Sequence, residues 1–419
     1  GAVKVSKGKI SDHYSVFVNP QRPIPLRITE LTSIDDSMVA DAKSIEEILP
    51  EFLSFCEGCS LVAHNAEFDV SFIEENCRRQ GIEPDFTSVD TVGLARVLLP
   101  TLSKFKLNVV AKALNISADG VLIGSTGVIG KQIPIDKLTA GIKVLAGKKN
   151  DTLENGTEAA KAIMTTDTFP KELAVAIEVG GKTVTIGGMA KGSGMIHPNM
   201  CTMLAFITTD AVITKDALQK ALSEDVGDTY NMISVDGDTS TNDSVVLLAN
   251  GMAENPEITY GTEDYKNFAE ALHTINEYLA KKIAGDGEGA TALFEVKAVG
   301  CESVKQAKTL AKSIVCSNLT KTAIAGHDAN WGRILCAMGY SGAQFDPEKV
   351  DLFFASKAGK IQIIENGTAV DYSEAEATKI LSETEVTAIA DVKMGDKTAT
   401  AWGCDLTHGY IEINADYRS

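Results

Sequence analysis

The chain has 419 residues, which is long enough for two or three compact domains, each with its own core. Hydrophobic residues make up 44% and charged residues 23%; these proportions are those of a globular protein and exclude disordered and fibrous classes. The formal net charge of -18 repels phosphate backbones and disfavours nucleic-acid binding by the whole chain.

The first part of the chain, residues 1–117, shows short alternating strand and helix patterns, which predict an α/β segment. Ser44, followed by Glu46 and Glu47, is suited to cap the first of two helices. The expected strands are Ala2–Val5, Tyr14–Val18 and Ser60–Ala63, and the expected helices are Ser44–Cys56 and Phe68–Gln80.

The eight cysteines are scattered, which favours reduced thiols in a cytoplasmic protein. Cys56 and Cys59 have CxxC spacing, but a zinc ribbon needs a second such pair, so ordinary thiols are favoured over a metal or redox centre. No apolar run reaches the roughly 18 to 20 residues of a membrane span, and no secretory leader opens the sequence. We therefore expect a cytoplasmic protein with no membrane partner.

Polar turn residues near Ile116–Gly120 interrupt this pattern, and we place a domain boundary between residues 117 and 118. Two long amphipathic helices are expected beyond it, over Tyr265–Ile283 and Val304–Val315, each covering a sheet. The expected strands are Leu204–Thr209, Asn231–Val235, Val245–Ala249, which reads as buried, and Leu293–Val299.

The most informative stretch runs from Gly187 to Asp210: small residues and a Pro-Asn turn lead into an apolar strand that begins at Thr202. A threonine hydroxyl is a weak nucleophile at neutral pH unless a base removes its proton, and the residue's own α-amino group can be that base. Attack of the Thr202 hydroxyl on the Cys201 carbonyl, followed by ester hydrolysis, would free this amine. Thr202 is therefore a candidate nucleophile made by self-cleavage.

Attack on a carbonyl also needs donors for the developing oxyanion, each worth about 3 to 4 kcal/mol. The Gly-rich segment Gly124–Gly130 is the best candidate, because its backbone N–H groups can converge and Thr126 adds a hydroxyl. Each of these pieces alone is typical of ordinary turns and strand starts, so only their combination indicates catalysis.

Together these segments closely resemble the ornithine acetyltransferase family, also called glutamate N-acetyltransferases. The likeness covers about residues 118–419. Its motifs are Ser125–Gly130, Thr165–Lys171, Lys191–Met200, Gly285–Thr291, Gly326–Arg333 and Asn414–Ser419.

The resemblance implies Thr202 as nucleophile, cleavage between Cys201 and Thr202, and an oxyanion hole formed by Thr126 and Gly127. Lys191 would supply a cation for the substrate carboxylate, and Glu288 an anion for its amine. The residues implied to hold the amino-acid substrate are Thr168, Lys191, Thr202, Glu288, Asn414 and Ser419.

The implied reaction is ping-pong: acetyl passes from N2-acetylornithine to Thr202 and then to glutamate, within arginine biosynthesis. No metal or organic cofactor is required, and acetyl-CoA is a further donor for some members. The implied fold is an αββα stack of sheets and helices. An α piece ending at Cys201 and a β piece starting at Thr202 would stay together and assemble further, as a heterotetramer.

This chain departs from the family pattern at two places. The residue before the nucleophile is commonly Ala and is Cys201 here; we expect tolerance, because the attacked group is a backbone carbonyl. Family members normally carry about a hundred residues of their own before the Ser125–Gly130 motif, which supply part of the sheet and the pocket wall. Another sequence stands there in this chain.

That sequence, residues 1–116, resembles part of a DEDD-type proofreading exonuclease of a DNA polymerase. Such an enzyme holds two divalent cations with several carboxylates, whereas this segment offers only Asp69, so we expect no nuclease activity. A polymerase-associated exonuclease fragment and an inert fusion product remain the alternatives to an acetyltransferase. The matching residues are Val18–Pro23, Ile28–Ile34, Val62–Asp69, Val89–Thr91 and Leu107–Asn108.

Overall fold

The computed structural model describes residues 2–6, 9–24, 35–56, 60–63, 66–82, 87–90, 122, 124–127, 134–148, 152–198, 203–240 and 242–416. The chain forms two compact units. One comprises Gly1–Val121 with Leu138–Lys143, and the other comprises Leu122–Lys137 with Val144–Ser419.

The described residues of the first unit form two small sheets and the helices α2, α3 and α4. Strands β1 and β2 pair antiparallel, and strands β3 and β4 pair parallel. Its elements are β1 (Ala2–Ser6), β2 (Lys9–Tyr14), α2 (Asp36–Val39), α3 (Ile45–Cys56), β3 (Ser60–Ala63), α4 (Ala66–Gln80) and β4 (Thr87–Asp90). Helix α7 (Ile135–Ala146) is divided between the two units.

Most of the elements expected in this unit are confirmed, including both helices, the opening strand and β3. At the start of α3 the Ser44 N–H donates to the Glu47 carboxylate over 2.9 Å, which is the glutamate half of a capping box. The strand expected at Tyr14–Val18 is wrong. Strand β2 ends at Tyr14, where its pairing with β1 ends, and the apolar side chains of Val16 and Phe17 that suggested a strand are exposed.

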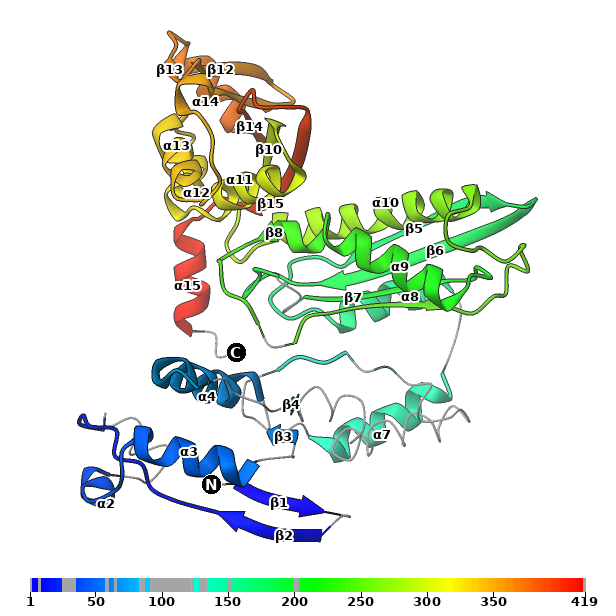
Figure 1. Ribbon diagram of the computed structural model, residues 1–419. Coiled ribbons are helices and arrows are strands. Elements are labelled where there is room, and N and C mark those ends of the chain that lie inside the picture. The colour runs from blue at the N-terminus through cyan, green and yellow to red at the C-terminus, as the bar shows by residue number, and fades with distance from the viewer. Residues whose placement is uncertain are drawn as a thin grey trace. The chain divides into compact units, whose positions relative to one another are not determined.

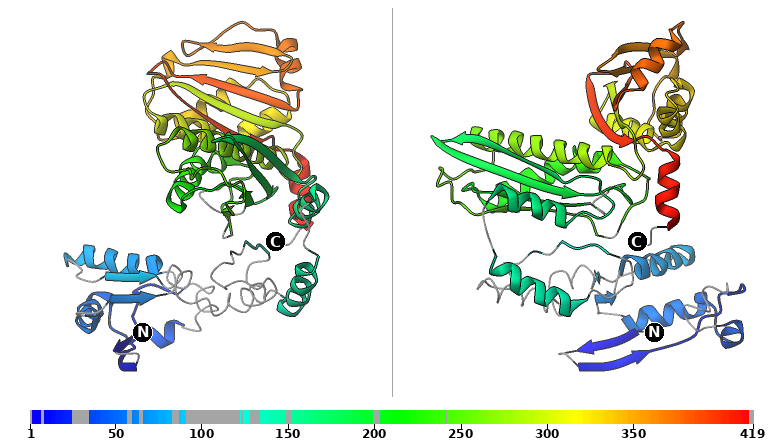
Figure 2. Two further views of the ribbon diagram at one scale, coloured as in Figure 1. Left: turned by 90° about the vertical axis from the view of Figure 1, so that its right-hand side faces the viewer. Right: turned by 180° about the vertical axis from the view of Figure 1, so that it is seen from behind.

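In the second unit, one sheet has the strand order β5-β6-β7-β9. Strand β6 pairs antiparallel with both β5 and β7, and β9 pairs parallel with β7. The β5–β6 hairpin turns at Gly180 and Gly181, whose φ angles of +57° and +76° suit a tight primed turn; Figure 2 shows it from behind. The strands are β5 (Lys171–Val179), β6 (Lys182–Lys191), β7 (Leu204–Thr209) and β9 (Ser244–Ala249).

Helix α10 (Glu263–Gly285) lies along this sheet (Figure 1). Five apolar residues on one face of the helix are fully buried: Phe268, Leu272, Ile275, Leu279 and Ile283. Their burial contributes on the order of 10 kcal/mol to folding. The helix approaches β6 closely at Gly188, where an added Cβ would lie 2.9 Å from Ile275.

The other sheet of this unit has the strand order β13-β12-β11-β14-β10-β15-β8. Helix α11 (Val304–Cys316) packs on β10 and β15, and α14 (Glu374–Leu381) packs on β11 and β12. The strands are β8 (Ile233–Ser234), β10 (Leu293–Cys301), β11 (Asp351–Ser356), β12 (Gly359–Glu365), β13 (Thr368–Ala369), β14 (Glu385–Asp391) and β15 (Lys397–Cys404). The remaining helices are α8 (Leu153–Ala162), α9 (Lys215–Val226), α12 (Asn318–Ala325), α13 (Trp331–Gly339) and α15 (His408–Asp416), with 3₁₀ turns at Tyr230–Met232 and Pro347–Lys349.

The stacked sheets and helices confirm the expected α/β architecture. Both expected long helices and the expected strands at 204–209, 245–249 and 293–299 are also confirmed. Two details are wrong. Of the strand expected at Asn231–Val235, only Ile233–Ser234 pairs with a neighbour, because a 3₁₀ turn occupies the residues before it. The run Val245–Ala249 is not buried, because β9 is an edge strand, and Leu248 is 49% exposed. No described helix is long and apolar enough to cross a bilayer.

Candidate active site

Three strands of the β5-β6-β7-β9 sheet come together where the nucleophile segment enters it. Lys191, the last residue of β6, pairs with Leu204, the first residue of β7, and Leu204 pairs with Ser244, the first residue of β9. The predicted nucleophile Thr202 stands two residues before Leu204 in the chain; Cys201, Thr202 and Ser419 lie outside the described residues. The sheet thus places Lys191 beside the strand that follows the predicted nucleophile.

A buried ion network adjoins the end of β6. The Lys171 ammonium, fully buried at the start of β5, lies 2.7 Å from Asp167 Oδ1 and 2.5 Å from Asp286 Oδ2. The Gly192 N–H donates to Asp167 over 2.7 Å. Burial alone would raise the pKa of Asp167, but the Lys171 charge and the Gly192 N–H lower it below its usual range. The network therefore joins the residues that precede β5, the end of β6 and the end of α10.

Thr168 is attached to the same network. Its backbone N–H donates to Asp286 Oδ2 over 3.0 Å, and its hydroxyl donates to Asp286 Oδ1. The residue is nonetheless exposed. Because its proton is committed to Asp286, the hydroxyl oxygen is oriented as an acceptor for a ligand donor.

Lys191 is only 3% exposed, and burial lowers the pKa of its ammonium group. Asp167, Asp243 and Glu288 act in the opposite direction and favour the charged form. Among the described residues no carboxylate lies within salt-bridge distance of Lys191. A cation held this way is well suited to receive an anionic group of a ligand.

Glu288 and Asn414 are brought together from distant parts of the chain. The Asn414 side-chain amide, on α15, donates to Glu288 Oε2 over 2.7 Å. The Glu288 backbone N–H donates to the Ser193 carbonyl over 3.0 Å, and the Ser193 hydroxyl donates to the Asp286 carbonyl over 2.6 Å. Gly194 lies so close to the Glu288 carboxylate that an added Cβ would overlap it. These contacts fix a buried carboxylate beside the segment that leaves β6.

The predicted oxyanion-hole residues lie in the described stretch 124–127, which has no regular secondary structure. Gly124 rests against β7: an added Cβ would lie 2.6 Å from the Phe206 ring. Thr126 and Gly127 are exposed. The predicted donors are thus on a segment that contacts the strand following Thr202.

Sequence reasoning missed several charged residues of this region. Asp167 and Lys171 flank Thr168 within one motif, Asp286 precedes Glu288 by two residues, and Asp243 immediately precedes β9. The signal for the first three was their place in short motifs already rich in predicted site residues. Asp243 had no such signal, because only the pairing of β9 with β7 brings it near the site.

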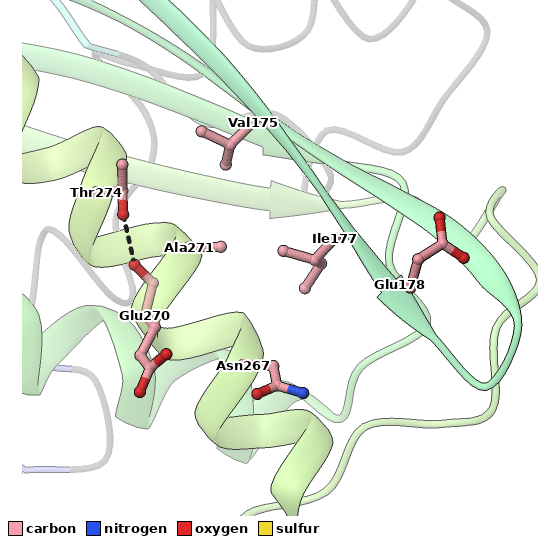
Figure 3. A pocket seen from close by; sticks show the side chains of 7 residues that line it. All are labelled: Val175, Ile177, Glu178, Asn267, Glu270, Ala271 and Thr274. Carbon is pink, nitrogen blue, oxygen red and sulfur yellow. Dashed lines mark hydrogen bonds between the residues drawn. The ribbon is translucent and has the colours of Figure 1, made fainter.

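A hollow of about 420 Å³ lies between β5 and α10, and Figure 3 shows the side chains that line it. The Thr274 hydroxyl there donates to the Glu270 carbonyl over 2.9 Å. None of the predicted site residues lines it, and Val175, its lining residue nearest in β5, stands four residues from Lys171, roughly 13 Å at strand spacing. This hollow is therefore separate from the candidate site. Its lining residues are Val175, Ile177, Glu178, Asn267, Glu270, Ala271 and Thr274.

The described residues contain no group of three or more His, Cys, Asp or Glu side chains suited to hold a metal ion. Six cysteines in the described part of the chain are free thiols, Cys56 among them, whereas its CxxC partner Cys59 lies outside that part. The groups gathered at the start of β7 are those of acid–base and ion-pair chemistry.

Comparison with known proteins gives a family for most of the chain. The ArgJ family model matches residues 103–419. A relative from Thermotoga neapolitana, named arginine biosynthesis bifunctional protein ArgJ, is 53% identical over 309 residues, which cover 74% of this chain and 77% of the relative. The chain belongs to the ArgJ family.

Other ArgJ relatives agree. The protein of the same name from Symbiobacterium thermophilum is 52% identical over 309 residues, 74% of this chain and 75% of its own length. The crystal structure of arginine biosynthesis bifunctional protein ArgJ from Bacillus halodurans matches with a TM-score of 0.50 and 48% identity, covering 52% of this chain and all of that chain. The resemblance stated from the sequence motifs is thereby confirmed.

The beginning of the chain matches something different from the ArgJ family. A family model described as exonuclease matches residues 1–120. This match overlaps the ArgJ match at residues 103–120. Asp69, the metal-ligand candidate of that segment, falls in α4, and its side chain lies outside the described part.

Proposed function

We propose that this ArgJ-family chain is an ornithine acetyltransferase and glutamate N-acetyltransferase of arginine biosynthesis, which acts through an acetylated Thr202. One observation carries the proposal. The pairing of β6 with β7 sets the buried Lys191 beside the strand that continues from Thr202. The relatives' name, arginine biosynthesis bifunctional protein, supports the same pathway.

The chain first activates itself. The Thr202 hydroxyl attacks the Cys201 carbonyl carbon, the C–N bond breaks as the nitrogen gains a proton, and water hydrolyses the resulting ester. The products are an α piece ending at Cys201 and a β piece whose first residue, Thr202, has a free α-amino group. That amine is the base for the hydroxyl on the same residue.

Acetyl transfer then follows in two halves. The α-amino group takes the hydroxyl proton as Oγ attacks the acetyl carbon of N2-acetylornithine, and Thr126 and Gly127 donate to the oxyanion. The same proton passes to the leaving nitrogen, and ornithine departs. Glutamate then attacks the acetyl-Thr202 ester by the reverse sequence, and no cofactor enters either half.

The groups around the start of β7 suit an α-amino acid substrate. The Lys191 ammonium pairs with its carboxylate, and the Glu288 carboxylate pairs with the side-chain amine of N2-acetylornithine, the amine that is not acetylated. Asn414 holds Glu288 in place over 2.7 Å and offers its amide oxygen, because its amide nitrogen also donates to the Tyr410 carbonyl. Thr168 and Ser419 complete the polar contacts, and acetyl-CoA is a second donor to be tested.

The two pieces remain associated after cleavage because a strand pair and an ion pair join residues on the two sides of the cleaved bond. Strand β6 of the α piece pairs with β7 of the β piece from Ile186 to Lys191. Lys171 of the α piece is bound to Asp286 of the β piece. We propose that the joined pieces assemble further, as a heterotetramer, in the cytoplasm, and that residues 118–419 form the acetyltransferase domain.

Mass spectrometry of the purified chain tests self-cleavage. We expect two fragments that meet between Cys201 and Thr202, and an intact chain for Thr202→Ala. Cys201→Ala is the matched control, which should cleave normally because the thiol takes no part. An uncut wild-type chain, or normal cleavage of Thr202→Ala, would contradict the proposal.

Acetyl transfer from N2-acetylornithine to glutamate tests the reaction. The acetylated intermediate is sought as a mass increase of one acetyl group on the β piece when N2-acetylornithine is given without glutamate. The increase should disappear when glutamate is added, and ornithine should be released in equal amount. Acetylation that maps to a cysteine would rule out Thr202 as the nucleophile.

The exonuclease match favours a second candidate for residues 1–120. We propose that this segment is inactive, because Asp69 is one carboxylate where two-metal chemistry uses several. Incubation of the chain with single-stranded DNA and Mg²⁺ or Mn²⁺ checks this. Release of nucleotides, absent from an Asp69→Asn variant, would establish nuclease activity instead.

A further inference from the structure

Asp243 has none of the roles that were predicted from the sequence. It immediately precedes β9, and Ser244, the next residue, pairs with Leu204 at the start of β7. The Ser244 N–H donates to the Met203 carbonyl over 2.9 Å. Two backbone contacts thus tie the residues after Thr202 to the residues after Asp243.

The carboxyl group of Asp243 is buried without a matching donor. Neither of its oxygens has a hydrogen-bond partner of regular geometry in the part of the chain that the structure describes. Burial raises the pKa of this carboxyl to about 8, while the Met203 amide and the Lys191 charge act to lower it. A buried carboxyl of this kind is costly unless a donor or cation meets it in the functional state.

Self-cleavage would create such a cation next to Met203. The Met203 amide nitrogen is bonded to the Thr202 carbonyl carbon, and backbone dimensions keep the nitrogens of successive residues about 3 to 3.7 Å apart. The Ser244–Met203 hydrogen bond and the pairing of Ser244 with Leu204 hold Asp243, the residue before Ser244, beside the start of the β piece. Its carboxyl is therefore the candidate partner for the α-amino group of Thr202.

We infer that Asp243 is a positioning residue of the acetyltransferase, whose carboxylate holds the α-amino group of Thr202 once cleavage has freed it. The inference rests on the proposed function. Thr202 Oγ is then the nucleophile, the α-amine is the base and Asp243 orients that base, the arrangement in which a third group fixes the base of a nucleophile.

The role of Asp243 is seen by tracing the proton of the Thr202 hydroxyl through the reaction. When Oγ bonds to the acetyl carbon, its proton moves to the α-amine, which becomes an ammonium ion. The Asp243 carboxylate stabilises this positive charge at short range. When the proton leaves with the ornithine nitrogen and the C–N bond breaks, the amine is neutral again. Asp243 itself exchanges no proton in either half-reaction.

The pH dependence of acetyl transfer distinguishes this role from a structural one. A carboxylate beside an amine raises the amine's pKa, so Asp243→Asn should move the acidic limb of kcat/KM down by about one pH unit. We expect kcat at its optimum to fall at least about tenfold and KM to stay within about twofold. Asp243→Glu should restore the limb in part, because it keeps the charge.

Asp225→Asn is the matched control. Asp225 is another largely buried carboxyl whose pKa burial raises, and it bonds His273 and Asn276 away from the start of β7. The Asp225→Asn chain should cleave itself, and the acidic limb of its kcat/KM should lie at the same pH as in the wild-type enzyme. Lys191 is the charged group that acts on Asp243 from β6, and it is left unchanged in every variant.

Each result of these experiments either supports or overturns the inference about Asp243. A cleaved Asp243→Asn enzyme with the wild-type pH limb would overturn the inference, whether or not its kcat is lower. Failure of Asp243→Asn to cleave, while Asp243→Glu and Asp225→Asn cleave, would overturn it too, because the carboxylate would then act before the amine exists. If the wild-type chain neither cleaves nor transfers acetyl, the proposed function fails and the inference falls with it.

Discussion

The side-chain amide of Asn414 donates to Oε2 of Glu288 over 2.7 Å, although the two residues are 126 positions apart. The bond connects α15, close to the end of the chain, with the segment that follows α10. A hydrogen bond to an ionised acceptor contributes about 1.5 to 3 kcal/mol.

Asn414→Ala removes this donor and frees the carboxylate to move. Under the proposed function we expect KM for N2-acetylornithine to rise about tenfold, equivalent to about 1.4 kcal/mol, with cleavage at Thr202 unchanged. Steady-state kinetics measure the effect. Ile411→Ala, on the same helix and 65% exposed, is the control and should leave KM as it is; equal losses in the two variants would point to the helix and not to the bond.

Gly194→Ala tests the close approach to the same carboxylate. The added methyl group would overlap the Glu288 carboxyl, so we expect Glu288 to be displaced and kcat/KM to fall at least about tenfold. Gly187→Ala is the matched change on β6, where the nearest atom is 3.9 Å from the added Cβ. Similar kinetics for the two variants would show that Glu288 has no part in substrate binding.

Lys171→Met tests the buried ion network. It leaves the buried carboxylates of Asp167 and Asp286 without their shared cation, so we expect the free energy of unfolding to fall by about 3 to 5 kcal/mol. Lys161→Met removes the exposed pair with Glu158 and should cost less than about 1 kcal/mol. Urea denaturation followed by circular dichroism measures both. A loss at Lys171 no larger than at Lys161 would contradict the network's role.

The raised pKa of Asp243 predicts how the uncut chain responds to pH. Between its ordinary value near 3.8 and about 8, the folded chain keeps a proton that the unfolded chain has lost. The stability tied to this proton is therefore present at low pH and is lost as pH rises toward 8.

This dependence can be measured in a Thr202→Ala background, which keeps the chain uncut. Adding Asp243→Asn should remove the dependence, so the melting temperature of the double variant should exceed that of Thr202→Ala increasingly between pH 5 and pH 8. A difference of about 1 kcal/mol corresponds to about 2 to 4 °C. A constant difference across this range would show that Asp243 does not titrate there.

The sequence was sufficient for the long amphipathic helices, because their apolar period continues for several turns; α10 and α11 lie where the periodicity places them. It was also sufficient for the family, through six spaced motifs. It failed where pairing partners decide the outcome. The strand expected at Tyr14–Val18 lacked a neighbour beyond Tyr14, and the run Val245–Ala249 formed an edge strand with an exposed side.

In the candidate site, too, some residues were predicted from the sequence and others were not. Glu288 and Asn414 were named from motifs, and the structure brings them into contact. Lys171 and Asp286 lay in motifs but were given no role, because an ion pair between residues 115 positions apart leaves no local pattern. Asp243 needed the register of β9 against β7, which no composition or spacing reveals.

The ion network has a further consequence when the proposed chemistry is considered in time. Asp167 and Lys171 precede the Cys201–Thr202 bond, and Asp286 follows it. The three meet only when both stretches have folded around each other. If the proposed cleavage requires this arrangement, a chain that has cut itself is one that has reached its native fold. The fraction of cut molecules in a cell extract would then count correctly folded enzyme, without any assay of its activity.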